Sequence, residues 1–179
     1  VGTRDMEFIR LRLRYDRFMD AMKVRIACEQ RLYQRVIGEI FCSPEGLYPE
    51  GELEDMFLEA KATDMVLRAL LTAESQAEKL LEESLAEFSF YTEVLSKVVG
   101  IGPRIAARIV SQVGDIRKFS TVNKFKAYCG VHLLSDGRFA RKRVGQRANW
   151  SNNLRQAFFL GADQMNKRPD SEWGERFLA

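Results

Sequence analysis

Apolar residues recur every three or four positions over most of the chain, which is the spacing of one face of an α-helix. Residues 4–41 follow this pattern as one long segment, with an interruption near Ile26 and Glu29. In residues 52–97 the apolar positions lie close to heptad spacing, although Glu74 occupies a place on the stripe. We therefore predict an all-α fold that begins with a long helical hairpin, a coiled-coil-like arm.

The clearest break in the pattern separates these two segments. Residues 42–51 contain two prolines and two glycines, which favour a turn or loop. Because the break is short, we expect the flanking helices to run antiparallel. The apolar stripe of the arm then packs on a partner chain, such as a second copy that gives a homo-oligomer, on a further domain, or within an ordinary intramolecular bundle. The pattern leaves these possibilities open.

A glycine turn follows the arm and organises the rest of the chain. The sequence LSKVVGIGPRIAARIVSQVG at residues 95–114 predicts a helix, a tight turn at Gly100 and Gly102, and a second helix. Pro103 suits the first position of that helix because it has no N–H to lose, and Gly114 is expected to end it. This is a helix-hairpin-helix pattern. We divide the chain into an arm, residues 1–94, and a compact domain, residues 95–179.

Such a turn can bind a phosphate without reading bases. Gly100 and Gly102 allow backbone N–H groups to approach a phosphate closely, and the helix N-terminus adds partial positive charge. Arg104 and Arg108 lie four residues apart, on one face of the helix, where both can contact the same DNA strand. The alternative is a structural hairpin that binds nothing. The two arginines and the basic region after them weigh against that alternative.

Charge divides the chain in the same place. Residues 45–99 carry 13 acidic and 4 basic side chains, whereas residues 100–179 carry 15 basic and 6 acidic ones. A polyanion such as DNA is therefore expected to bind the C-terminal part. Three cysteines and one histidine at no metal-ligand spacing argue against a zinc site or a disulfide scaffold, and favour the cytoplasm. No stretch approaches the roughly 20 apolar residues of a membrane span, so we expect no membrane partner.

Three further positions carry local signals. Ser120 or Thr121 is expected to cap a short helix that Gly130 ends. Ser151 fits the N-cap of a later helix better than it fits a nucleophile. Trp150 lies among arginines and asparagines, where packing is favoured over stacking on a base.

Motifs beyond the turn extend this pattern. The chain continues as GDI-x-x-F up to Phe119 and as AY-x-G up to Gly130. Together with the glycine turn, these motifs resemble the C-terminal domain of the DEDD insertion-sequence transposases, a family that includes Piv-type invertases and bridge-RNA-guided recombinases. The resemblance covers about residues 90–178. It implies a DNA transposase or site-specific recombinase, with DNA and a guide RNA as partners.

The resemblance also assigns a nucleophile. By position, Ser135 matches the serine that joins covalently to a DNA phosphate in this family. A hydroxyl oxygen can attack phosphorus while arginines neutralise the developing charge. The equally open alternative is a turn residue, since Ser-Asp-Gly is a common turn sequence.

Basic residues follow this serine and are expected to line the same DNA path: Arg138, Arg141, Lys142, Arg143 and Arg147. In the family, a RuvC-like domain holds four carboxylates that bind magnesium, but no α/β pattern precedes residue 4. We therefore expect no cofactor in this chain itself and no cleavage by this chain alone. The family's Ser/Thr-Lys-x-Gly stretch is also missing, because residues 145–153 read differently.

The sequence thus predicts the DNA-binding part of a transposase or recombinase. Two other classes remain open. One is a structure-specific DNA-binding or repair accessory protein, which would be indifferent to Ser135. The other is a helical scaffold whose arm dimerises and whose glycine turn is only architectural.

Overall fold

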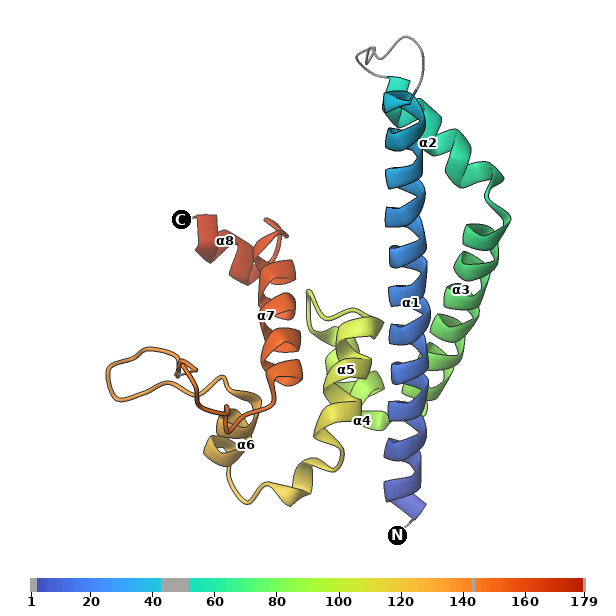
Figure 1. Cartoon of the computed structure of the whole chain (residues 1–179). Helices are drawn as coiled ribbons and strands as arrows, with labels where there is room; N and C mark the ends of the chain where they lie inside the picture. Colours follow the sequence, from blue (N-terminus) through green and yellow to red (C-terminus); the bar gives the residue numbers. More distant parts are fainter. Residues whose placement is uncertain (1–2, 43–51, 143, 179) are drawn as a thin grey trace. The chain divides into compact units, whose positions relative to one another are not determined.

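The computed structural model describes residues 3–42, 52–142 and 144–178, and this part of the chain is helical, with no named strand (Figure 1). The all-α prediction is therefore confirmed. The elements are α1 (Thr3–Phe41), α2 (Glu52–Thr63), α3 (Met65–Ala86), α4 (Ser89–Glu93), the 3₁₀ helix η1 (Leu95–Lys97), α5 (Pro103–Val113), the 3₁₀ helix η2 (Ile116–Lys118), α6 (Val122–Cys129), α7 (Asn152–Asn166) and α8 (Glu172–Leu178).

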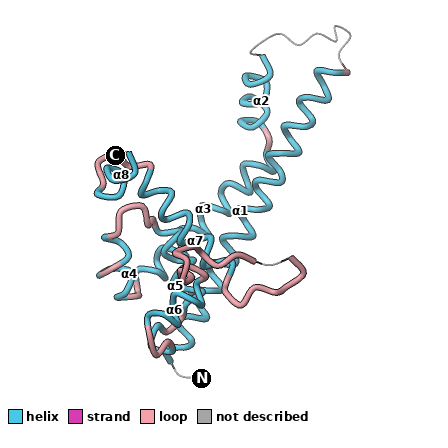
Figure 2. The backbone as a smooth tube through the Cα atoms, turned by 90° about the vertical axis from the view of Figure 1, so that its left-hand side faces the viewer, coloured by secondary structure: helices cyan, strands magenta, loops and turns pink. Residues whose placement is uncertain are grey.

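The chain forms two compact units. Residues 16–80 make one, the arm unit, and residues 1–15 with 81–179 make the other, the turn unit. Figure 2 shows helices in both units and a long irregular loop between α6 and α7. The domain boundary expected at residue 94 stays a prediction.

In the arm unit, α1 runs antiparallel to α2 and α3. The side chains that meet are Arg25 with Glu74, Glu29 with Lys61, and Tyr33 with Phe57. The partners' numbers fall as the α1 numbers rise, so the helices point in opposite directions, as predicted. The break expected at residues 42–51 lies outside the described residues apart from Cys42.

A polar cluster of Arg25, Glu29, Lys61 and Glu74 explains both irregularities in the arm's stripe. The Arg25 guanidinium donates to the two carboxylate oxygens of Glu74 at 2.7 and 3.2 Å, and to Glu29 at 2.9 Å. Glu74 is only 7% exposed. Its hydrogen bonds raise the pKa of Arg25. Hydrogen bonds from Lys61 and, to a smaller extent, from Arg25 hold the pKa of Glu29 below its usual value. A buried carboxylate is tolerated here because it has charged partners.

The helical segment predicted for residues 52–97 is not continuous. Asp64 interrupts it, because its carboxylate accepts a hydrogen bond from the Leu67 N–H at 2.7 Å and so caps α3. The chain leaves the helix again after Ala86. The prediction of one long second helix is therefore wrong in detail.

The core of the turn unit forms between α5 and α7, which pack against each other. Fully or nearly fully buried apolar residues include Ala106, Ile109, Val110, Val113, Leu154 and Ala157. Two residues of the family-like motifs are also in contact, since the rings of Phe119 and Tyr128 lie 5.1 Å apart. Cys129 is 0% exposed, and burial raises the pKa of its thiol to about 11.

Helix ends in the turn unit follow the predicted signals. Thr121 accepts a hydrogen bond from the Lys124 N–H and caps α6, which Gly130 ends at φ +71°. Ser151 caps α7 by accepting from the Leu154 N–H. Pro103 and Gly114 begin and end α5 as expected. These predictions are confirmed because each depends on only a few neighbouring residues.

Candidate nucleic-acid interface

The glycine turn is preceded by less helix than predicted. Residues 95–97 form a single 3₁₀ turn, and the short α4 lies before it, so a regular first helix up to residue 99 is wrong. The turn itself closes where the Ile101 N–H donates to the Val98 carbonyl oxygen at 3.1 Å. Gly100 is the third residue of this turn and has φ +86°, a value that favours glycine.

Gly100 faces the protein interior. A Cβ at this position would lie 2.8 Å from Met165 and 2.9 Å from the Gly161 carbonyl oxygen, both on α7. The residue is buried. The structure therefore places Gly100, one of the predicted phosphate-binding residues, where it shapes the turn and lets α7 approach.

Gly102 lies in the opposite environment. It is exposed, and nothing lies within 4 Å of the position that a Cβ would take. Its carbonyl oxygen accepts the first α5 hydrogen bond, from the Ala106 N–H at 3.0 Å, and no side chain caps the helix. The first N–H groups of α5 thus lie at an open helix end, which suits an anion.

A groove of about 350 Å³ follows this turn, and we call it the turn groove. It is lined by Tyr91, Ser96, Lys97, residues 98–103 and Arg168. Lys97 and Arg168 are both exposed, so two cations lie beside the open end of α5. Sequence reasoning missed both residues.

The backbone around Arg168 is held firmly. The Ser171 N–H donates to the Arg168 carbonyl oxygen at 3.0 Å, and the Ser171 hydroxyl contacts the same oxygen at 2.8 Å. Gly174 packs so closely that a Cβ there would lie 1.9 Å from that oxygen. No local sequence signal links Arg168 to the turn, because only the packing of α7 and α8 brings it there.

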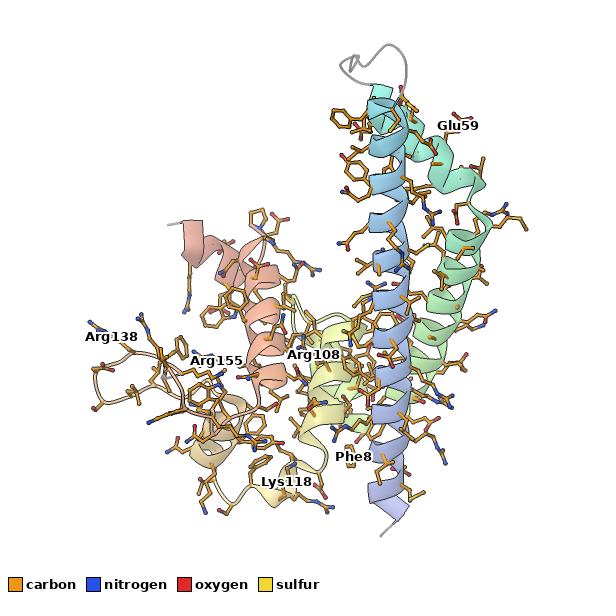
Figure 3. All side chains as sticks on the ribbon, in the orientation of Figure 1. Phe8, Glu59, Arg108, Lys118, Arg138 and Arg155 are labelled. Carbon is orange, nitrogen blue, oxygen red and sulfur yellow. The ribbon has the colours of Figure 1, made fainter. Side chains whose placement is uncertain are left out.

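The two predicted arginines of α5 differ in environment. Arg104 is exposed, whereas Arg108 is half-buried. The Arg108 guanidinium donates to Gln156 Oε1 at 2.7 Å and to Asn153 Oδ1 at 3.4 Å, both on α7 (Figure 3). Arg108 therefore joins α5 to α7 in addition to any contact with a ligand.

Ser135 lies at an exposed turn. The Gly137 N–H donates to the Leu134 carbonyl oxygen at 2.9 Å, and the Leu134 N–H donates to the Arg138 carbonyl oxygen at 2.8 Å. Ser135 and Asp136 are thus the central residues of a tight hairpin turn, with Gly137 at φ +76°. An exposed hydroxyl at such a turn is accessible to DNA, and a turn role and a nucleophile role are both compatible with this position.

A second groove, of about 480 Å³, lies along the loop that follows, and we call it the loop groove. Its lining residues are His132, Leu134, Asp136, Arg138, Phe139, Ala140, Arg141, Lys142, Asn149 and Trp150. Three of the predicted basic residues, Arg138, Arg141 and Lys142, meet here. Arg147 is exposed but does not line the groove, and Arg143 lies outside the described residues.

Trp150 supports this groove by packing. A Cβ at Gly130 would lie 2.6 Å from the Trp150 ring, and the Arg155 guanidinium lies over the ring at 5.2 Å. Arg155 also donates to the Ala140 carbonyl oxygen at 2.7 Å (Figure 3). Trp150 therefore has the packing role favoured by its sequence context. Arg155, like His132, Phe139 and Asn149, was not predicted as part of a site.

A metal site and a membrane-spanning helix would be two further features of residues 3–42, 52–142 and 144–178. No three His, Cys, Asp or Glu side chains gather there as a metal ion would require. The magnesium that the family resemblance implies belongs to the RuvC-like domain of the family, and that expectation stays a prediction. None of the helices described is both long enough and apolar enough to cross a membrane.

Comparison with known proteins finds similarity to insertion-sequence transposases. Residues 92–178 match the family model described as "Transposase IS116/IS110/IS902 family". The chain is also 30% identical over 97 residues to the "Mini-circle putative transposase for IS117" of Streptomyces coelicolor. That match covers 54% of this chain and 23% of the relative, so the shared part is under a quarter of the relative's length. No solved structure matches the chain.

The matched region begins at Thr92 and so contains the whole glycine turn, the loop groove, Ser135 and the lining of the turn groove apart from Tyr91. Both comparisons support a relationship to insertion-sequence transposases. The arm before residue 92 lies outside the family match.

Proposed function

We propose that this chain is the DNA-binding part of an insertion-sequence transposase or recombinase, and that it holds the DNA phosphate backbone at the turn groove. The observation that carries this proposal is the open N-terminus of α5 beside two exposed cations, Lys97 and Arg168. A helix N-terminus with nearby cations favours a phosphate, and it recognises no base. The similarity of residues 92–178 to a transposase family makes DNA the natural source of that phosphate.

At this glycine turn the roles of the two glycines differ. Gly102 lets the strand approach the α5 N–H groups, and Gly100 provides the turn that presents them. Arg104 extends the contact along the strand. Arg138, Arg141 and Lys142 add a second cationic stretch at the loop groove. Binding is then weakly sequence-specific and strongly salt-dependent, because phosphate contacts release counterions.

The exposed hydroxyl of Ser135 is the proposed nucleophile of the complete enzyme. Its oxygen would lose its proton and attack a DNA phosphorus, the bond from phosphorus to the leaving sugar oxygen would break as that oxygen takes up a proton, and the serine would remain joined to the phosphate. Basic side chains of the loop would offset the charge that develops on the phosphate oxygens. A guide RNA and a second copy of the chain stay predictions.

A salt titration of DNA binding tests the backbone-binding proposal. Fluorescence anisotropy on a labelled duplex is expected to give a steep fall of log K with log salt. Lys97→Ala with Arg168→Ala should lower the slope by about two, one for each lost phosphate contact. The control is Arg68→Ala with Lys79→Ala, which removes two exposed cations from the arm unit. Equal slopes in the two double variants would remove the turn groove from the binding account.

The nucleophile is tested separately in a complete protein that carries a catalytic domain. Ser135→Ala should abolish covalent protein–DNA adducts, while noncovalent DNA binding by the chain persists. Adducts that survive this substitution would leave Ser135 as a turn residue. DNA binding without any adduct in the complete wild-type protein would favour the repair-accessory alternative.

A further inference from the structure

The loop groove contains an exposed aromatic ring among its cations. Phe139 is 54% exposed and lies in the sequence between Arg138 and Ala140, with Arg141 and Lys142 close behind. All three cations are exposed and line the same groove. The backbone of Phe139 is held by an antiparallel bridge to Leu133. The ring is therefore presented on an ordered turn of the chain.

His132 adds an unsatisfied polar atom to this groove. Its Nδ1 atom is buried and has no hydrogen-bond partner in the described part of the chain. A buried ring nitrogen without a partner is costly, and in native proteins such an atom usually finds one. His132 lines the loop groove, so a rotation of its ring would bring this atom within reach of a bound ligand.

These features match an unpaired nucleotide better than a stretch of duplex. Cations alone would suit the phosphates of either form of nucleic acid. An exposed aromatic ring gains most from a free base face, which a base within a duplex does not offer because its neighbours cover it. Trp150 does not serve this purpose, since Arg155 and Gly130 lie against its ring. Phe139 is the ring in the groove that remains exposed.

We propose that the loop groove binds one unpaired nucleotide, with its base on the Phe139 ring and its phosphates against Arg138, Arg141 and Lys142. His132 gives the nucleotide a hydrogen bond. This inference rests on the proposed DNA-binding function and specifies which form of nucleic acid the chain prefers. It gives the loop that carries Ser135 a means of holding a strand that has left the duplex.

The test compares two probes on the 179-residue chain. One is a labelled blunt DNA duplex, and the other is the same duplex with a short single-stranded end that contains 2-aminopurine. Wild-type protein is expected to bind the tailed probe about five- to tenfold more tightly, in keeping with one stacked base, and to quench the 2-aminopurine fluorescence. A tail made of RNA in place of DNA distinguishes the two sources of an unpaired nucleotide.

Phe139→Leu is the decisive variant because it keeps an apolar side chain and removes the ring. It should bring the tailed-probe affinity down to that of the blunt probe, abolish quenching and leave blunt-duplex affinity within about twofold. Phe159→Leu is the matched control, since Phe159 is also a highly exposed ring, 69%, but lies on α7 and does not line the groove. The control should retain the preference for the tail.

Other outcomes overturn the proposal. Equal binding of both probes by wild-type protein, or a preference that survives Phe139→Leu, would exclude the unpaired-nucleotide site while backbone binding stands. Failure to bind even the blunt duplex would remove the proposed function as well. His132→Phe should weaken only tailed-probe binding, and His132→Asn should retain part of the preference for the tail. An unchanged preference in His132→Phe would remove this residue from the site.

Discussion

The arm unit and the turn unit use charge in opposite ways. In the arm unit, the buried Glu74 and the half-buried Arg25 and Glu29 satisfy one another within the fold. In the turn unit, exposed cations line two grooves whose walls are mostly loop. Paired charge of the first kind is satisfied within the fold, whereas charge of the second kind is available to a polyanion. A count of basic residues alone would not separate these two roles.

Gly100 offers the strongest way to break the turn unit and leave the arm unit intact. Gly100→Ala places a Cβ at 2.8 Å from Met165 on a backbone with φ +86°. We expect a loss of about 3 kcal/mol in the free energy of unfolding, from backbone strain and overpacking together. Urea unfolding followed by tryptophan fluorescence measures it, since both tryptophans lie in the turn unit.

The matched control is Gly102→Ala, two residues away. No atom lies within 4 Å of its Cβ position and its φ is −79°, so the cost should stay within about 0.5 kcal/mol. DNA affinity should respond in Gly102→Ala, because the methyl group lies where a phosphate is proposed to approach. Equal destabilisation by the two substitutions would contradict the inward and outward roles assigned to these glycines.

Glu74 offers the corresponding break in the arm unit. Glu74→Ala leaves the Arg25 guanidinium without its main partner and should lower the free energy of unfolding by about 2 kcal/mol, since Arg25 retains Glu29. Thermal unfolding followed by circular dichroism measures the loss. Glu59→Ala, an exposed carboxylate on α2, is the control and should change little.

A double substitution sharpens that result. Arg25→Leu with Glu74→Leu replaces the ion pair by apolar side chains. It should recover much of the lost stability, because neither charge of the pair is left without its partner. A double variant no more stable than Glu74→Ala would mean that the polar cluster also fixes the register of the helices.

The smallest expected effect concerns pH. Lys61 and Arg25 lower the pKa of Glu29 in the folded state from the usual 4.5. The stabilisation is therefore complete above pH 4.5 and is lost as the pH falls through the lower, folded-state pKa. Compared with wild type, Glu29→Gln should be less stable at pH 7, and the difference should shrink in acid. A difference that grows as the pH falls would contradict the assigned direction.

Local features of this fold could be predicted from the sequence, and tertiary ones could not. The caps Thr121 and Ser151, the helix start at Pro103 and the helix end at Gly114 each depend on a few adjacent residues. Glu74 could be recognised from the sequence as a charged residue on an apolar stripe. Its partner Arg25 could be identified only once the pairing of the helices was known.

The candidate site follows the same division. Basic residues near Ser135 could be grouped from the sequence because they are close along the chain. Arg168 reaches the turn groove only through the packing of α7 and α8, and Gly100 turns inward only because α7 lies behind it. Phe139 and His132 could not be predicted as site residues, because the exposure of the Phe139 ring and the unpaired nitrogen of His132 are properties of the folded loop.

The buried thiol of Cys129 allows the opening of the turn unit to be followed by the rate of its alkylation. Alkylating reagents react with the thiolate, which is scarce at neutral pH for a fully buried group with a pKa near 11. Cys42 is exposed and belongs to residues 16–80, so it should be modified at once. Peptide-level mass spectrometry separates Cys129 from Cys42 and from the half-buried Cys28, so the delay at Cys129 reports the opening of the turn unit. Bound DNA should lengthen that delay if it holds the turn unit closed.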